Sequence, residues 1–146
     1  MPERETLERA QEDAREGKSA STQAGEFVRE EIHHIREGKH GAASARQAIA
    51  IGLSKARRAG VKLAPPKGSA SLQKKAAQDT KAAKKGGSRK PSVTRSRAVE
   101  GALKREPRNT ANHEALSRQA KKSAATRGKK SRSQAAKKAV RTRKAA

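Results

Sequence analysis

The sequence contains no cysteine and no long apolar run. Without cysteine there are no disulfides, no thiolate metal sites and no thiol catalysis, which fits a reducing compartment. Because no segment approaches 18 consecutive apolar residues, we expect no membrane-spanning helix and no membrane partner. The first residues are charged and lack an apolar stretch, so we expect no secretory signal. These absences predict a cytoplasmic protein.

Large apolar side chains are also scarce. Alanine accounts for 29 residues, whereas Leu, Ile, Val and Phe together number 16, or 11% of the chain. Only six of these 16 follow residue 64. So few apolar groups do not offset a backbone entropy cost of roughly 1–2 kcal/mol per residue. We therefore expect residues 64–146 to be largely disordered, or helical only conditionally.

Positive charge is abundant and unevenly distributed. Lys and Arg number 37 against 14 Asp and Glu; residues 1–63 carry a net charge of +2 and residues 64–146 a net charge of +21. A long positive segment attracts polyanions, and each phosphate that it neutralises releases condensed counterions. Residues 64–146 have no Phe, Tyr or Trp to stack on unpaired bases. This favours duplex DNA as the partner, or RNA bound through charge alone.

The chain divides into three zones by composition. Residues 1–18 predict a short charged helix that ends at Gly17, and residues 64–146 form a Lys/Arg/Ala-rich low-complexity tail. Residues 19–63 predict a helical hairpin with a break at 38–41. Its first helix is capped at Ser19, Ser21 or Thr22, and its second begins at a capping box of Ser44 and Gln47 and stops at Gly60. The fold class expected is all-α.

The hairpin has a small core, so we expect it to be only marginally stable as a monomer. We expect stabilisation from a homodimer partner, from the helix in 1–18, or from DNA. A sequence-reading helix-turn-helix is one interpretation of the hairpin, but its small core favours a structural or dimerising role. Four basic residues of its second helix are nevertheless secondary candidates for nucleic-acid binding: Arg46, Lys55, Arg57 and Arg58.

The tail supplies the main candidate binding residues. We predict helices from Thr110 or Asn112 to Arg127, with Gly128 as the stop, and from Ser131 to about Lys144. The lysines and arginines of the tail are expected to neutralise phosphates and to bridge duplexes. They are Lys74, Lys75, Lys84, Lys85, Arg89, Lys90, Arg95, Arg97, Lys104, Arg105, Arg118, Lys121, Lys122, Arg127, Lys129, Lys130, Arg132, Lys137, Lys138, Arg141, Arg143 and Lys144.

No other chemistry is indicated. His33 and His34 are adjacent and do not share a helix face, so we interpret them and His40 as solvated histidines and predict no metal ligands. The acid-rich stretch 3–37 is interpreted as a solvated helix surface; the alternative is that it folds back on the basic tail. The sequence contains no arrangement of a nucleophile and a base and no phosphate-binding loop, so we predict neither catalytic residues nor a cofactor.

Two resemblances add to this interpretation. Residues 26–63, and above all the run from Arg46 to Lys62 (RQAIAIGLSKARRAGVK) with Glu37-Gly38-Lys39 before it, resemble a group of small bacterial proteins of unknown function. That resemblance implies a short helical domain, often followed by a basic tail, with no established activity. The tail itself resembles the Lys/Ala/Ser-rich tails of linker histones and bacterial histone-like proteins, which implies non-specific DNA binding.

The function we predict is non-catalytic, largely sequence-independent DNA binding by a nucleoid-associated, histone-like protein. Two alternatives remain open. The same charges suit RNA or ribosome association. In the other alternative the hairpin binds another protein through Phe27, Ile32, Ile49 and Leu53, and the basic tail only localises it.

Overall fold

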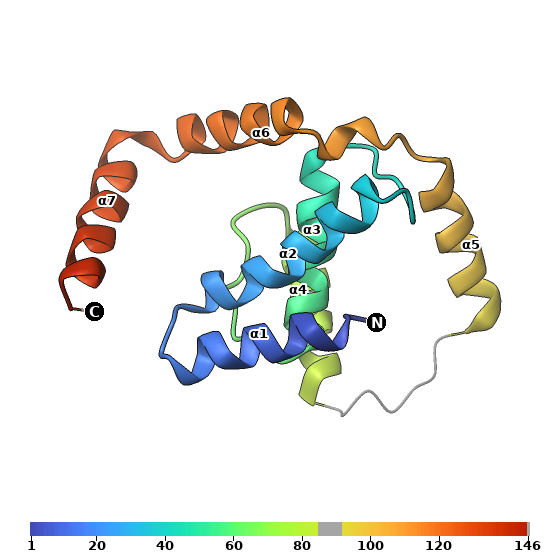
Figure 1. The fold of residues 1–146 in the computed structure, drawn as a ribbon, viewed down its shortest axis with the longest axis horizontal. Coiled ribbons are helices and arrows are strands. Elements are labelled where there is room, and N and C mark those ends of the chain that lie inside the picture. Colours follow the sequence, from blue (N-terminus) through green and yellow to red (C-terminus); the bar gives the residue numbers. More distant parts are fainter. Residues whose placement is uncertain (85–91, 146) are drawn as a thin grey trace. The chain divides into compact units, whose positions relative to one another are not determined.

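The computed structural model describes residues 1–84 and 92–145, and every helix and turn in these ranges agrees with the predicted all-α class. Lys85, Arg89 and Lys90, which were predicted to bind nucleic acid, lie outside the described residues. Contacts divide the chain into two compact units, Met1–Ala111 and Asn112–Ala146 (Figure 1). The helices are α1 (Arg4–Arg15), α2 (Ala20–Arg36), α3 (Ala45–Arg58), α4 (Ala70–Lys84), α5 (Val93–Arg105), the 3₁₀ turn η1 (Asn109–Ala111), α6 (His113–Thr126) and α7 (Gly128–Ala145).

The ends of α2 and α3 follow from local side-chain chemistry. The hydroxyl of Ser19 accepts from the backbone N–H of Thr22 at the start of α2. At the start of α3, Ser44 Oγ accepts from Gln47 N at 3.2 Å, while Gln47 Oε1 accepts from Ala43 N at 2.6 Å. The predicted capping box is therefore present, with the return bond displaced by one residue. Gly38 and Gly60 have φ of +78° and +98° just beyond the two helices, where other residues would be strained.

Two small apolar clusters form the core of the first unit. One joins Phe27 and Ala24 of α2 to α1 and α3, and the other joins Ile35 to residues around α3 and η1. Phe27 and Ile35 are 1% and 0% exposed. The predicted need for a stabilising partner is thus met within the chain, because α1 packs on α2 and contributes Ala10 and Leu7 to the Phe27 cluster.

Helix α3 approaches α2 closely at Gly52. A Cβ atom built there would lie 2.6 Å from Val28 Cα and 2.9 Å from the Phe27 carbonyl oxygen, both of which are backbone atoms of α2. Glycine in the middle of a helix costs about 1 kcal/mol relative to alanine in helix propensity. Tertiary packing therefore requires glycine at position 52, although helix propensity favours alanine there.

We expect Gly52→Ala to lower the free energy of unfolding by about 2–3 kcal/mol, although alanine favours helix formation. The added methyl group would push α2 and α3 apart. The atoms that it would contact belong to the backbone of α2, which cannot move aside as a flexible side chain can. Urea unfolding followed by circular dichroism measures the change. Gly25, on the exposed side of α2 with no atom near its Cβ position, is the matched control: Gly25→Ala should leave stability unchanged or increase it, and equal effects at both positions would refute the packing argument.

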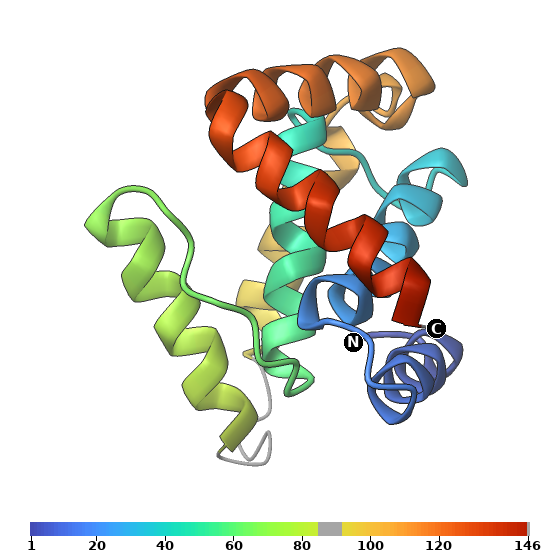
Figure 2. The same cartoon turned by 90° about the vertical axis from the view of Figure 1, so that its left-hand side faces the viewer.

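Helix α4 packs against α3 (Figure 2), and its buried residues are Ala76 and Asp79 rather than large apolar side chains. Asp79 is 4% exposed and lies between two side chains of α3. Ser54 Oγ donates to Asp79 Oδ2 at 2.7 Å, and Arg58 Nε donates to Asp79 Oδ1 at 2.8 Å. Ala76, on the same helix, is 7% exposed.

The segment after α5 also joins the first unit, through backbone hydrogen bonds to the loop between α2 and α3. Gly41 N donates to Leu103 O at 2.8 Å, and Ala42 N donates to Pro107 O at 3.0 Å. Any side chain at Gly41 would collide with the carbonyl group of Glu106. Arg36 Nε donates to the Ala111 carbonyl oxygen at 3.0 Å.

The expectation of a short hairpin followed by a disordered or only conditionally helical tail therefore needs correction. Helix α4 and residues 103–111 belong to the compact unit, and α5, α6 and α7 are helical as well. That expectation rested on the small number of large apolar residues after residue 64. The contacts that hold these segments are made by backbone groups, by Asp79, and by alanines such as Ala76 and Ala111, which need little space to be buried.

The second unit consists of α6 and α7. Asn112 caps α6 by accepting from Ala115 N at 2.8 Å, and Gly128 has φ of +69° after it, as the sequence predicted. Helix α7 begins at Gly128, three residues before the predicted start at Ser131. No helix within residues 1–84 and 92–145 is both long and apolar enough to cross a lipid bilayer.

Candidate functional site

The second unit carries a dense and unpaired positive charge. Residues 112–146 contain twelve Lys or Arg residues and one acid, Glu114, for a net charge of +11. All twelve basic side chains are exposed, and none of them forms an ion pair with a residue that the structure describes. They are Arg118, Lys121, Lys122, Arg127, Lys129, Lys130, Arg132, Lys137, Lys138, Arg141, Arg143 and Lys144.

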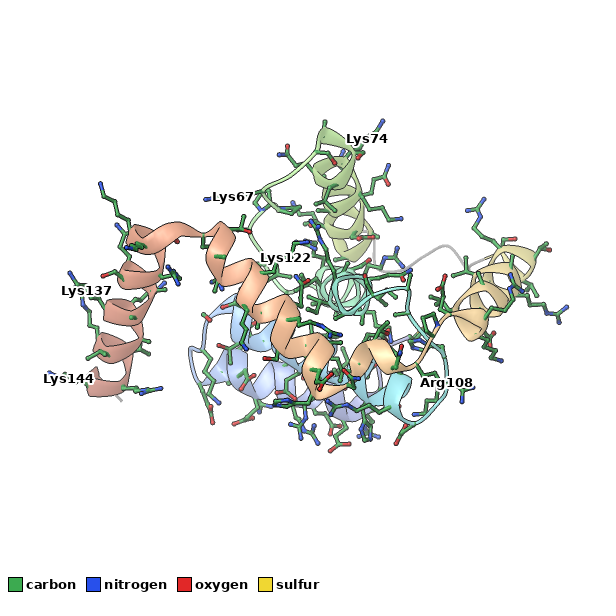
Figure 3. The ribbon with its side chains drawn as sticks, turned by 90° about the horizontal axis from the view of Figure 1, so that it is seen from above. Lys67, Lys74, Arg108, Lys122, Lys137 and Lys144 are labelled. Carbon is green, nitrogen blue, oxygen red and sulfur yellow. The ribbon has the colours of Figure 1, made fainter. Side chains whose placement is uncertain are left out.

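Part of this charge forms a row on α7. Lys130, Lys137, Arg141 and Lys144 recur at i, i+7, i+11 and i+14, which places them within about 60° of one another around the helix. The row extends over about 21 Å along the helix axis at 1.5 Å per residue. Lys137 and Lys144 project from the same side of α7 in Figure 3. We call these four residues the α7 basic row.

The remaining tail residues that we predicted to bind nucleic acid lie on the surface of the first unit. Lys104 pairs with Glu100 one helical turn earlier, at 2.7 Å. The others in the described ranges are exposed on α4 and α5: Lys74, Lys75, Lys84, Arg95, Arg97 and Arg105.

The four secondary candidates on α3 are placed very differently. Arg46 is exposed, whereas Arg57 is 9% exposed and Arg58 pairs with the buried Asp79. Lys55 points into the unit, where its ammonium group contacts the carboxylates of both Glu30 and Glu31. The structure thus uses Lys55 and Arg58 to neutralise buried acids of its own.

Glu30 and Glu31 of α2 are buried, with side chains 2% and 1% exposed. Lys55 Nζ lies 2.8 Å from Glu30 Oε1. Burial opposes ionisation of the Glu30 carboxyl, but hydrogen bonds from Lys55, the Thr6 hydroxyl and the Glu3 backbone N–H outweigh it and lower its pKa. Burial likewise opposes the charge on Lys55, and its two carboxylate partners outweigh this and raise the pKa of Lys55.

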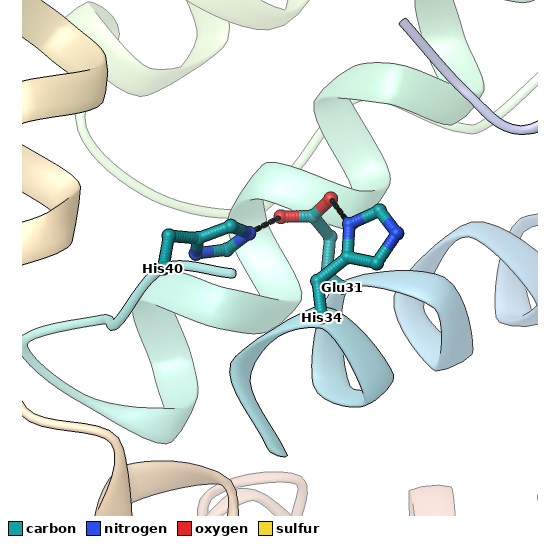
Figure 4. Close-up of side chains that lie close together, drawn as sticks. All are labelled: Glu31, His34 and His40. Atoms are coloured by element: carbon teal, nitrogen blue, oxygen red, sulfur yellow. Dashed lines mark ion pairs between the residues drawn. The ribbon is translucent and has the colours of Figure 1, made fainter. Parts of the chain in front are cut away.

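Two histidines flank the Glu31 carboxylate on its other sides. His34 Nδ1 lies 3.8 Å from Glu31 Oε1, and His40 Nε2 lies 3.5 Å from Glu31 Oε2 (Figure 4). The three side chains offer ligand atoms that all lie within 4.8 Å of one another. The interpretation of all three neighbouring histidines as solvated is wrong for His34 and His40, whose side chains are only 12% and 15% exposed; His33, 67% exposed, is solvated as expected.

The acid-rich stretch is also not simply a solvated surface. Glu31 falls on the line of Phe27 and Ile35, four residues from each, so it shares the face that α2 buries. That spacing is visible in the sequence. A glutamate at such a position is nevertheless expected to be solvated, unless the positive group that neutralises it is known. The partners, Lys55 and His40, lie 24 and 9 residues further along the chain. Their proximity depends on how α2, α3 and the loop between them pack.

Comparisons with known proteins give one match. Residues 15–68 match the model of a family of unknown function (DUF6496). The matched residues include the whole of α2 and α3, and with them Glu31, His34, His40 and Lys55. No curated protein and no solved structure matches the chain. Over this segment, which is a little over a third of its length, the chain is similar to a family without an assigned function, in agreement with the resemblance expected from the sequence.

Proposed function

We propose that this protein binds duplex DNA without catalysis and largely without regard to sequence, as a nucleoid-associated, histone-like protein, and that residues 112–146 are the main binding element. One observation carries the proposal. In this segment twelve basic side chains are exposed, a single acid accompanies them, and no ion pair with the described residues occupies them.

The arrangement suits phosphates better than base edges. Duplex DNA presents one negative charge per about 1.7 Å of its axis, so a basic row about 21 Å long meets several phosphates at once. Lys and Arg contacts to phosphate give affinity through counterion release and carry no sequence information. Lys74, Lys75 and the exposed arginines of α5 enlarge the positive surface of the first unit and favour additional, weaker contacts.

The protein-interaction alternative receives less support. Phe27, which that alternative requires at a docking surface, is 1% exposed and is covered by α1 and α3. A homodimer through the hairpin, also predicted from the sequence, is not needed to cover this side chain. RNA binding rests on the same charges as DNA binding, and a direct competition separates the two.

Replacing the α7 basic row with glutamine (Lys130, Lys137, Arg141 and Lys144) in the full chain should weaken duplex DNA binding by about 100-fold at 0.15 M salt. The slope of log K against log salt concentration should become shallower by about 3.6, since each of the four lost phosphate contacts removes roughly 0.9 from it. Fluorescence anisotropy across a salt series, on duplexes of two unrelated sequences, measures both quantities.

The matched control also removes four positive charges, but from the first unit, by replacing four residues with glutamine. Each of these residues forms an ion pair with an acid of α1 or α2: Arg4, Arg15, Lys18 and Arg29. This control should retain most of the affinity. Equal losses in the two variants would mean that net charge alone matters and would refute a binding element in 112–146. Preference for structured RNA over duplex DNA at one fixed salt concentration would replace DNA by RNA as the partner.

A further inference from the structure

Beyond any role in nucleic-acid binding, we propose that Glu31, His34 and His40 bind one divalent transition metal ion of the zinc class. Two imidazoles and one carboxylate are a donor set that suits Zn²⁺, with a fourth position left for water or another ligand. Two of the ligands come from α2 and one from the loop between α2 and α3 (Figure 4).

Each of the two imidazoles has one nitrogen that faces Glu31 and one that faces away from it. The hydrogen bond made by the nitrogen that faces away determines whether the nitrogen facing Glu31 carries a proton or a lone pair. His40 Nδ1 lies 3.0 Å from the Gly41 carbonyl oxygen, which can only accept, so this nitrogen is the donor. His34 Nε2 lies 2.8 Å from Glu3 Oε1, which as a carboxylate also accepts. In a neutral imidazole the remaining nitrogen then carries a lone pair. In both rings that nitrogen is the one facing Glu31.

Two lone pairs that face a carboxylate repel it unless a cation lies between them. The observed N···O separations of 3.5 and 3.8 Å exceed the usual range of an N–H···O hydrogen bond, so protonated imidazoles are not closely paired with Glu31. Ligands bound tetrahedrally at 2.0–2.1 Å lie about 3.3 Å apart. Because the ligand atoms now lie within 4.8 Å of one another, a bound metal ion requires them to move closer together by up to about 1.5 Å.

The outer contacts match those of metal-bound histidines. Such histidines donate their second N–H to a carboxylate or a backbone carbonyl, which orients the ring and increases its basicity. Glu3 does this for His34, and the Gly41 carbonyl does it for His40. His33, the adjacent histidine, instead contacts Glu37.

The charge balance also leaves room for a cation. The buried carboxylates of Glu30 and Glu31 share one ammonium group, that of Lys55, which leaves one negative charge in excess. Lys55 lies against Glu31 Oε1, so Oε2 is the oxygen open to a metal ion. Bound there, the ion would link α2 to the loop that holds residues 103–107 through Gly41 and Ala42, and so would stabilise the first unit.

The test uses the full chain and Zn²⁺ itself. Competition with a chromophoric chelator should give one ion per chain, and Zn²⁺ should raise the thermal midpoint followed by circular dichroism. A His34→Gln/His40→Gln double variant should bind at least about tenfold more weakly and show no rise in midpoint. His33→Gln is the matched control and should behave as the unchanged protein. Co²⁺ in place of Zn²⁺ should give the intense visible absorption of a four-coordinate site only where both His34 and His40 are present.

Failure of the unchanged protein to bind Zn²⁺, or equal binding by the double variant, would overturn the proposal. A loss of binding in His33→Gln as large as in the double variant would do the same. If the double variant does not fold, the proposal is tested on the unchanged protein by carbethoxylation of its histidines, measured by mass spectrometry. Zn²⁺ should protect His34 and His40 from this modification, but not His33. Equal modification of the three histidines with and without Zn²⁺ would then overturn it.

Discussion

Removal of residues 112–146 is expected to lower the affinity for duplex DNA by at least about ten-thousandfold at 0.15 M salt and to flatten the salt dependence. The segment holds twelve of the chain's 37 basic residues but only one of its 14 acids. Its removal lowers the net charge from +23 to +12, and nine of the remaining basic side chains form ion pairs with acids of the first unit. Electrophoretic mobility shift or anisotropy across a salt series measures the loss.

The shortened chain must keep its fold for this result to be meaningful. Because Met1–Ala111 contains both apolar clusters and the Glu30–Lys55 pair, its unfolding transition should match that of the full chain within about 1 kcal/mol. Unchanged affinity and an unchanged salt slope after the deletion would refute the proposal that 112–146 is the binding element.

Replacement of Lys55 by methionine is expected to lower the free energy of unfolding by roughly 3–5 kcal/mol, the largest effect of any single substitution considered. The change removes the ammonium group that neutralises Glu30 and Glu31 and leaves two carboxylates buried without it. Affinity for DNA should hardly change while the protein is folded, because the Lys55 ammonium faces inward. Urea unfolding and DNA titration on the same variant separate the two roles.

Lys62→Met, at an exposed lysine just beyond α3, is the matched control and should cost less than about 0.5 kcal/mol. Adding Glu30→Gln and Glu31→Gln to Lys55→Met should restore part of the lost stability, since neutral amides need no counter-charge. A Lys55 variant that unfolds as the parent does, but binds DNA poorly, would assign Lys55 to the interface instead.

The loss of stability on acidification should become smaller with this substitution. In the parent, the pKa of Glu30 is lower in the folded protein than its ordinary value of 4.5. Its stabilising contribution is therefore complete above pH 4.5 and is lost as the pH falls through the folded pKa. Without Lys55, the strongest of the contacts that lower the pKa of Glu30 is removed, so its pKa should be higher than in the parent and acidification should cost the variant less stability.

Local features were predictable because they depend on residues close in sequence. The Ser44–Gln47 cap, the glycines after α2 and α3, and the Asn112 start of α6 all follow from hydrogen bonds or φ angles within a few residues. The same holds for the α7 basic row, whose geometry needs only a helix and a spacing of 3.6 residues. For this reason the candidate nucleic-acid interface was visible without a structure.

The buried cluster was not predictable because its members are polar and come from separate elements. A glutamate on α2, a lysine on α3 and a histidine in the loop between them each look like ordinary surface residues. Likewise, nothing near Gly41 or Gly52 in the sequence reveals the backbone that each one contacts. Such contacts are made only when distant segments pack, and residue type alone does not encode them.

By itself, the sequence determined that this chain is helical, lacks cysteine, and concentrates its excess positive charge in residues 64–146, since composition and local spacing suffice for each. Only the tertiary structure decided that α4 and residues 103–111 belong to the compact unit, that Lys55 neutralises buried acids, and that His34 and His40 face Glu31. The physical reason is that burial changes what a charged side chain does. In water a lysine or histidine is free to meet any anion, whereas inside a packed unit its partners are set by the segments that surround it.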